Sequence, residues 1–239
     1  MTRILIVTSC TGEKLVKHER ALTLQDFEQG AHHLKTREQA LAEWLTPAGK
    51  MYTGLQHVRL MQGIAAFQQV TADKSPRLDL WILSAGYGLI SQDRSVAPYE
   101  CTFQGMKKTE LRSWANQLNV PADMRRLLAE PYDLALILLG DSYLEACQLD
   151  EAVQLGGPTL IFCGANTAKR LPNLAMARTI ILTNQDARRF SCGLVGLKGE
   201  VAARLLKHLS GDLSQLDQLI APATDVLALL DQRELAAHM

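Results

Sequence analysis

The sequence predicts an α/β fold: a single three-layer domain built on a mostly parallel sheet of about five strands. Five short apolar runs predict the sheet, because they are rich in Ile, Leu and Val and lack the polar alternation of a strand with one solvent-facing side. Helical spacing of apolar residues between the runs predicts the layers of helices. The predicted strands are Arg3–Thr8, Leu78–Leu83, Leu134–Leu139, Thr159–Phe162 and Thr179–Leu182.

The clearest predicted helix covers Thr53–Val70, which carries a broad apolar stripe of Leu, Val, Ile, Met and Phe. Shorter helices are predicted at Thr109–Leu118, Ala122–Leu128 and Glu200–Leu209, in each case between or after predicted strands. The repeated succession of strand, helix and strand is the pattern that favours a parallel sheet over an all-helical or all-β arrangement.

Two segments depart from this succession. Residues 16–45 are polar and have only a moderate helical pattern, over Glu28–Trp44, so we interpret them as a helical insertion after the first strand. Residues 211–239 predict two short amphipathic helices separated by Pro222. The predicted organisation is an α/β domain over residues 1–210, with a C-terminal helical extension over 211–239 packed on it.

The composition argues against several classes of protein. Lys and Arg together number 25, as do Asp and Glu, so the formal net charge is zero and a strongly basic nucleic-acid-binding domain is not indicated. The five cysteines are an odd number without a CxxC pair, which favours reduced thiols in a cytoplasmic protein. No run approaches the ~18 apolar residues of a membrane span. We expect no disulfide, no metal, no cofactor and no membrane partner.

Candidate binding residues follow the first predicted strand, because ligands of open parallel sheets bind outside the carboxyl ends of the strands. Ser9, Cys10, Gly12 and Lys14 offer hydroxyl and thiol groups, a flexible backbone and one cation, which together suit an anion. The spacing is not that of a GxxxxGK[ST] phosphate loop. The alternative is an ordinary turn, and in either case we expect Lys14 to be exposed.

The second predicted strand leads into Ser84 and then into Tyr87 and Gly88. Glycines on both sides of the tyrosine let the backbone approach a ligand, and Tyr87 on an exposed loop would stack against it or donate a hydrogen bond. The alternative is a tight turn that covers the end of the sheet. Further along, Tyr99 and Glu100 add an aromatic ring and a carboxylate.

Three further places carry candidate residues. Asp141, after the third strand, is either a catalytic acid or base or merely the cap of the next helix. Cys163, after the fourth, favours a buried thiol over a nucleophile, because no histidine lies near it in sequence. Tyr52, His57 and Arg59 lie where a loop enters the long predicted helix, and we treat them as candidate binding residues.

Several motifs resemble the YaaA-like family of bacterial proteins, which takes its name from the peroxide-stress protein YaaA. They are TSCTGEK after the first strand, PAGKMYTGLQHVRLM before a helix, WILSAGYGLISQD followed by APYE, and LLGDSYL, and the likeness spans roughly residues 1–210. The matching residues are Ser9, Cys10, Lys14, Tyr52, Ser84, Gly88, Pro98 and Tyr99. The resemblance implies an α/β fold, stress protection, DNA association and a nucleotide or nucleobase ligand. The long insertion Val16–Leu45 and the neutral charge depart from it.

Three functions follow as hypotheses. In the first, the protein acts on a nucleotide or nucleobase, cleaving or transferring at a glycosidic bond, with Asp141 or Glu100 as acid, base or nucleophile. In the second, it is a non-catalytic DNA-associated stress protein. In the third, it is a small-molecule sensor or scaffold without chemistry, and an oligomer is compatible with its helical tail. A deep pocket with a carboxylate would favour the first, and a clustered basic face the second.

Overall fold

A six-stranded sheet forms the centre of the computed structural model, which describes residues 2–71 and 76–237. The strand order is β10-β9-β8-β1-β4-β5. All pairs are parallel except β4 with β5, which is antiparallel. The α/β class and the mostly parallel sheet are therefore confirmed. The parallel strands are β1 (Arg3–Ser9), β4 (Arg77–Ser84), β8 (Leu134–Leu138), β9 (Thr159–Cys163) and β10 (Ala177–Ile181).

The sequence predicted about five strands, and the sixth strand of the sheet, the edge strand β5 (Gly88–Ser91), was not predicted. This strand is four residues long and follows β4 after a turn of three residues, so in the sequence it reads as part of a loop. Gly88 has a φ of +72°, and a Cβ there would lie 2.9 Å from the carbonyl oxygen of Leu118. A glycine is required at this point by the backbone.

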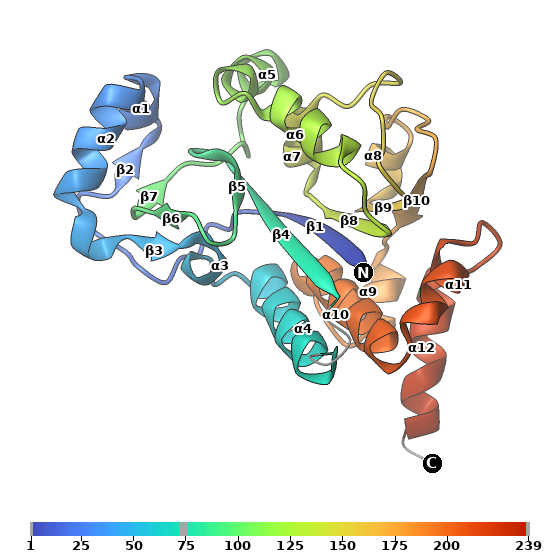
Figure 1. Ribbon diagram of the computed structural model, residues 1–239. Coiled ribbons are helices and arrows are strands. Elements are labelled where there is room, and N and C mark those ends of the chain that lie inside the picture. The colour runs from blue at the N-terminus through green and yellow to red at the C-terminus, as the bar shows by residue number, and fades with distance from the viewer. Residues whose placement is uncertain (1, 72–75, 238–239) are drawn as a thin grey trace.

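Helices cover both faces of the sheet (Figure 1), and a cluster of buried apolar side chains lies on each face. In β1, Leu5 and Val7 belong to one buried cluster and Ile4 and Ile6 to the other, which explains the unbroken apolar run. The first face packs against helices α3 (Ala48–Met51), α5 (Lys108–Gln117), α6 (Val120–Ala129) and α7 (Asp141–Cys147). The second packs against α4 (Leu55–Thr71), α9 (Asn184–Arg189) and α10 (Leu194–Gly211).

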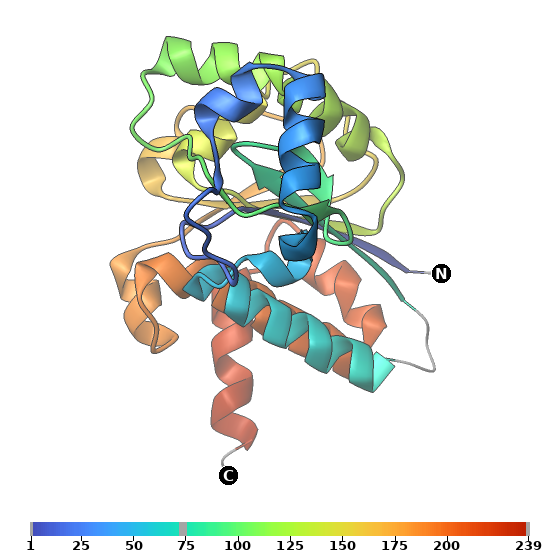
Figure 2. The same cartoon turned by 90° about the vertical axis from the view of Figure 1, so that its left-hand side faces the viewer.

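Helices α4 and α10 lie side by side on the second face, and glycines bring them into close contact (Figure 2). A Cβ at Gly63 would lie 2.5 Å from the Cα of Ala203, and one at Gly199 would lie 2.1 Å from the carbonyl oxygen of Gln56. Gly196 likewise approaches the side chain of Arg59. The two helices run parallel, because residues near the start of α4 contact residues near the start of α10. Both helices begin at the carboxyl edge of the sheet.

Residues 16–45 form small elements beside one end of the sheet. These are β2 (Leu22–Thr23), α1 (Leu24–Glu28), α2 (Ala31–Ala40) and the 3-10 turn η1 (Ala42–Trp44), followed by β3 (Thr46–Pro47). The short strands pair with β7 (Tyr99–Glu100) and β6 (Ser95–Val96), respectively. The expected helix over Glu28–Trp44 is therefore interrupted, and Gly30, with a φ of +87°, separates α1 from α2.

The acidic residue Asp26 holds this segment together. Its carboxylate accepts hydrogen bonds from Thr23, His33 and Arg37 at 2.9–3.0 Å. Burial raises the pKa of the Asp26 carboxyl, but these hydrogen bonds outweigh burial and hold the pKa below its usual value.

The C-terminal segment contains the 3-10 turn η3 (Leu213–Gln215) and helices α11 (Leu216–Ile220) and α12 (Val226–Ala237). Leu219, Val226 and Leu230 are buried in the cluster on the second face. Short α8 (Ala165–Ala168) lies between β9 and β10. Within residues 2–71 and 76–237, no helix has both the length and the apolar character that crossing a membrane requires.

Candidate functional site

The topology opens a crevice between β1 and β8. Strand β4 lies on one side of β1 in the sheet, whereas β8, β9 and β10 lie on the other side of β1. In chain order the parallel strands thus lie 2-1-3-4-5, a doubly wound order in which the connections diverge beside the first strand. Ligands of such sheets bind outside the carboxyl ends of the strands at this point.

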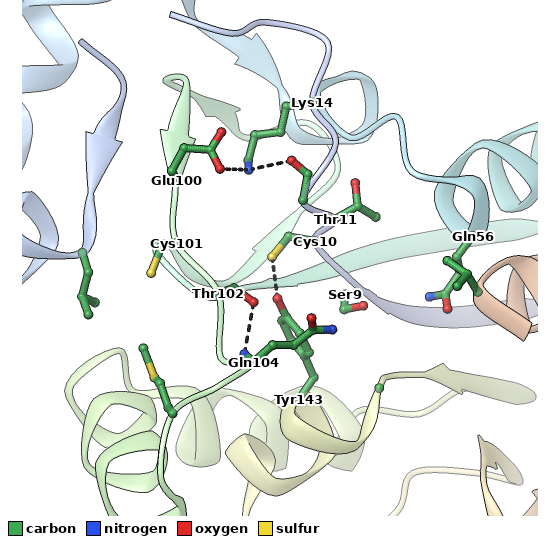
Figure 3. A pocket seen from close by; sticks show the side chains of 15 residues that line it. Ser9, Cys10, Thr11, Lys14, Gln56, Glu100, Cys101, Thr102, Gln104 and Tyr143 are labelled. Atoms are coloured by element: carbon green, nitrogen blue, oxygen red, sulfur yellow. Dashed lines mark hydrogen bonds and ion pairs between the residues drawn. The ribbon is translucent and has the colours of Figure 1, made fainter. Parts of the chain in front are cut away.

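A cavity of about 640 Å³ lies at this place, and we call it the switch-point cavity (Figure 3). Ser9–Gly12 and Lys14 line it from the segment after β1, and Gly140 and Tyr143 line it from the segment after β8. Strand β7 contributes Glu100, and the loop after it contributes Cys101, Thr102, Gln104 and Met106. Leu24, Gln56 and Val195 complete the lining.

Lys14 is the most unusual group in this lining, because its side chain is only 2% exposed. Its ammonium lies 3.6 Å from Glu100, whose side chain is 66% exposed, and 3.5 Å from the carbonyl oxygen of Gly12. It also lies 4.6 Å from the centre of the Tyr99 ring, a cation–π arrangement. The expectation that Lys14 is an exposed loop residue is wrong, because Lys14 pairs with Tyr52 in a β-bridge that draws it inward.

Buried hydroxyl groups form a network behind the cavity. The hydroxyl of Tyr99 lies 2.8 Å from that of Tyr52 and 2.8 Å from that of Ser84. On the cavity floor, the hydroxyl of Tyr143 lies 3.1 Å from the sulfur of Cys10. Burial raises the pKa of Tyr52, Tyr99 and Tyr143, so these hydroxyls remain protonated.

The aromatic residues expected to stack against a ligand do not reach the cavity. Tyr99 is fully buried, and its ring packs edge-on against Phe27 and Tyr87. Tyr87 is half-buried rather than exposed, and its hydroxyl accepts a hydrogen bond from the backbone N–H of Ala97 at 3.1 Å. Burial raises the pKa of Tyr87. These rings support the cavity wall instead.

The two expected catalytic carboxylates lie in different places. Glu100 faces the switch-point cavity, whereas Asp141 is the exposed first residue of α7 and lines a separate cavity of about 310 Å³ with Lys108 and Arg170. The N-cap of α7 is Gly140, so Asp141 is not the cap either. Successive residues of a helix point in directions about 100° apart, so Asp141 and its neighbour Gly140 do not face the same cavity.

The residues expected at the start of the long helix point in three directions. His57 is buried, and its Nε2 atom lies 2.9 Å from the carbonyl oxygen of Gly49. Burial lowers the pKa of His57. Arg59 pairs with Glu200 of α10 and does not line the cavity. Tyr52 belongs to the buried network, and Gln56, which the sequence analysis did not select, reaches the cavity.

Lys198 is a half-buried lysine at the carboxyl edge that the sequence analysis missed. Its ammonium donates a hydrogen bond to the carbonyl oxygen of Leu139. Burial lowers the pKa of Lys198, and the carboxylate of Asp141 opposes this effect. No sequence signal marks this residue, which is the fifth residue of α10.

The cysteines are free thiols. Cys10 and Cys101 line the switch-point cavity, and burial raises the pKa of Cys101 to about 12. Cys147 and Cys163 are fully buried. In the described part of the chain, no three His, Cys, Asp or Glu side chains are grouped so as to hold a metal ion.

Fold and site together define a doubly wound α/β protein with a polar, lysine-containing cavity at its topological switch point. The model of a family of unknown function, DUF6884, matches residues 46–160. This stretch includes Gln56, Glu100 and Tyr143 but not the segment from Ser9 to Lys14. No curated protein and no solved structure matches the chain. The family description names no activity, so a functional proposal depends on the site.

Proposed function

We propose that this chain binds a nucleotide or nucleobase-type small molecule in the switch-point cavity and cleaves or transfers at its glycosidic bond. The observation that carries the proposal is Lys14, a buried cation whose acidic neighbour is largely in solvent. Burying an ammonium is costly, and a site for an anionic group is a function that would retain it.

An anionic group of the ligand, such as a phosphate, would contact Lys14 and the segment that follows β1. The hydroxyl of Ser9 and backbone N–H groups of this segment are further donors for phosphate oxygens. Neither Tyr87 nor Tyr99 lines the cavity, so a base bound there would not stack on either ring. The apolar contacts available to a base are instead Leu24 and Met106.

Glu100 is the carboxylate among the described residues that line this cavity. Two carboxylates usually flank a bond that glycosidases cleave, but Asp141 does not face the cavity. We therefore assign two alternative roles to Glu100 alone: a nucleophile that attacks the anomeric carbon, or a general base that takes a proton from the water that attacks it. As a nucleophile, it forms a glycosyl ester while the base leaves with the bonding electron pair and gains a proton from water. Water or a second base then resolves the ester.

A thermal-shift screen of nucleotides, nucleosides and free bases tests the proposal. A ligand present at 100 times its Kd stabilises the fold by about 2.7 kcal/mol, which the screen detects readily. Ligands that bind are then incubated with wild-type protein and with Glu100→Gln, and released base is measured by chromatography. Binding and base release by wild type, with release lost in Glu100→Gln, is the expected result. Absence of binding by the whole panel contradicts the proposal.

The context that we propose is a cytoplasmic protein of bacterial stress or nucleic-acid modification, as the YaaA-like motifs imply. The proposal treats the chain as one three-layer domain, with residues 16–45 as an insertion beside the site and residues 211–239 as a helical extension. Binding without base release would instead support the sensor hypothesis.

Non-catalytic DNA association has less support from the placement of basic residues. Lys14 is buried, and Arg59, Lys108 and Arg189 each form an ion pair with a carboxylate. We retain this function as an outcome of the same screen, in which single-stranded and duplex oligonucleotides are included.

A further inference from the structure

Gln56 connects the two strands on either side of the switch point. It is the second residue of α4, and its Nε2 atom donates hydrogen bonds to Thr8 Oγ1 at 3.0 Å and to the carbonyl oxygen of Leu138 at 2.9 Å. Thr8 and Leu138 are themselves paired in the register of β1 and β8. The amide group of Gln56 therefore lies across the carboxyl ends of the two strands that form the crevice.

The orientation of this amide is determined by its partners. Rotation by 180° would place Oε1 against the carbonyl oxygen of Leu138, and two acceptors cannot form a hydrogen bond. The Nε2 atom has two hydrogens, and both are used by Thr8 and Leu138. The remaining polar atom is Oε1, an acceptor, to which no described residue donates a hydrogen bond.

The backbone of Gln56 is fixed as firmly as its side chain. Gly199 of α10 approaches its carbonyl oxygen so closely that any side chain there would collide with it. Two residues earlier, the N–H of Gly54 donates to Thr11 Oγ1 at 3.2 Å, which ties the helix start to the segment after β1. A binding group held by packing and by hydrogen bonds discriminates among ligands better than a mobile one does.

We infer that Gln56 is a specificity-determining residue that accepts a hydrogen bond from an N–H group of the base. The inference rests on the proposed function and narrows it to ligands with both an anionic group and an N–H donor. Figure 3 shows Lys14 and Glu100 on one side of the cavity and Gln56 on the other, with Ser9 and Cys10 between them. The anionic group is thus recognised at Lys14 and the base edge at Gln56.

The test compares matched ligands that differ in one N–H donor. Adenosine 5′-monophosphate is compared with purine riboside 5′-monophosphate, which has hydrogen in place of the amino group. Uridine 5′-monophosphate is compared with its N3-methyl derivative. A site that hydrogen-bonds an N–H group strongly rejects the analogue without it, because the acceptor is left unpaired. We expect at least one analogue to bind wild type about tenfold or more weakly than its parent.

Two variants assign this preference to Gln56. Gln56→Met keeps the length of the side chain but removes the amide, so the preference for the parent ligand should shrink at least about fivefold. Gln62→Met is the matched control, because Gln62 is an exposed glutamine of the same helix and does not line the cavity. In this control the preference should be unchanged. The stability of each variant without ligand is measured by urea unfolding.

The outcomes separate this inference from the proposed function. Failure of both parent nucleotides to bind overturns the inference, and failure of the whole nucleotide panel overturns the proposed function as well. If the parents bind and Gln56→Met keeps the wild-type preference, the inference alone is wrong. If Gln56→Met does not fold, the wild-type comparison decides: equal affinity for parent and analogue in both pairs overturns the inference.

Discussion

Replacement of Lys14 by methionine should remove ligand binding without unfolding the protein. The substitution keeps most of the buried side-chain volume and removes the charge. It loses a cation–π contact with Tyr99, worth about 0.5–2 kcal/mol, and an ion pair with the exposed Glu100, worth at most about 1 kcal/mol. It also removes the desolvation cost of a buried ammonium, which is several kcal/mol.

Because these contributions oppose one another, the free energy of unfolding of Lys14→Met should stay within about 1 kcal/mol of wild type or rise. Loss of a charge-assisted hydrogen bond costs about 1.5–3 kcal/mol of binding free energy. The affinity for a nucleoside monophosphate should therefore fall roughly ten- to a hundredfold. Lys14→Ala is a poorer probe, since it would also leave a cavity in a buried site.

Urea unfolding and isothermal titration calorimetry measure the two quantities separately. Lys50→Met is the control, because Lys50 lies on α3 and is exposed. It should change neither quantity appreciably. A Lys14→Met protein that is folded and binds with wild-type affinity would show that Lys14 is not part of the anion site. A strongly destabilised variant would show that the buried charge is structural.

Three further predictions, the last with a control variant, test other parts of the structure. Tyr99→Phe leaves two buried hydroxyls without a shared partner, so urea unfolding should show a loss of about 1–3 kcal/mol. The folded state lowers the pKa of the Asp26 carboxyl, so the ionised carboxylate stabilises the fold above the unfolded pKa of about 4. This stabilisation decreases as the pH falls below that value. The difference in unfolding free energy between wild type and Asp26→Asn should therefore shrink from about pH 5 to pH 3. Gly199→Ala should destabilise the protein by about 1–3 kcal/mol in thermal unfolding, because the added Cβ would collide with the backbone of Gln56 despite the better helix propensity of alanine. Gly211→Ala is the control and should not destabilise it, because a Cβ at Gly211 would have no atom within 4 Å.

The sheet could be predicted because its signal is local. The five apolar runs of the sequence correspond to β1, β4, β8, β9 and β10. Strands β8 and β9 are buried along their whole length, whereas in the edge strand β10 only Ile180 is buried. The rule that ligands bind at carboxyl ends of strands then selected Ser9, Cys10 and Lys14, which do line one cavity. Strand β5 was missed because it is only four residues long and is defined by its pairing with β4.

The remaining features of the site depend on contacts between distant parts of the chain. Gln56 reaches the cavity through partners 48 and 82 residues away, Thr8 and Leu138, and no local pattern records these distances. The burial of Lys14 likewise results from its bridge with Tyr52. Sequence reasoning treated polar loop residues as exposed, which is the usual case but not the case here.

The unequal exposure of Lys14 and Glu100 suggests how the two residues divide their roles. The cation is fixed in the wall, while the carboxylate is largely in solvent and lies 3.6 Å away, beyond normal hydrogen-bond distance. In the proposed complex, the anionic group of the ligand therefore competes with Glu100 for Lys14, and it displaces the Glu100 carboxylate towards the rest of the ligand. Glu100→Gln removes this competitor. An ion pair whose carboxylate is largely in solvent is worth about 0.2–1 kcal/mol, so the affinity for a nucleoside monophosphate should rise roughly 1.5- to fivefold. If Glu100 is also the catalytic carboxylate, base release should fall in the same variant, and tighter binding combined with lost turnover distinguishes an enzyme from a pure binding protein. Weaker binding by Glu100→Gln in calorimetry would mean that Glu100 contacts the ligand as an acceptor instead, and the competition argument would be refuted.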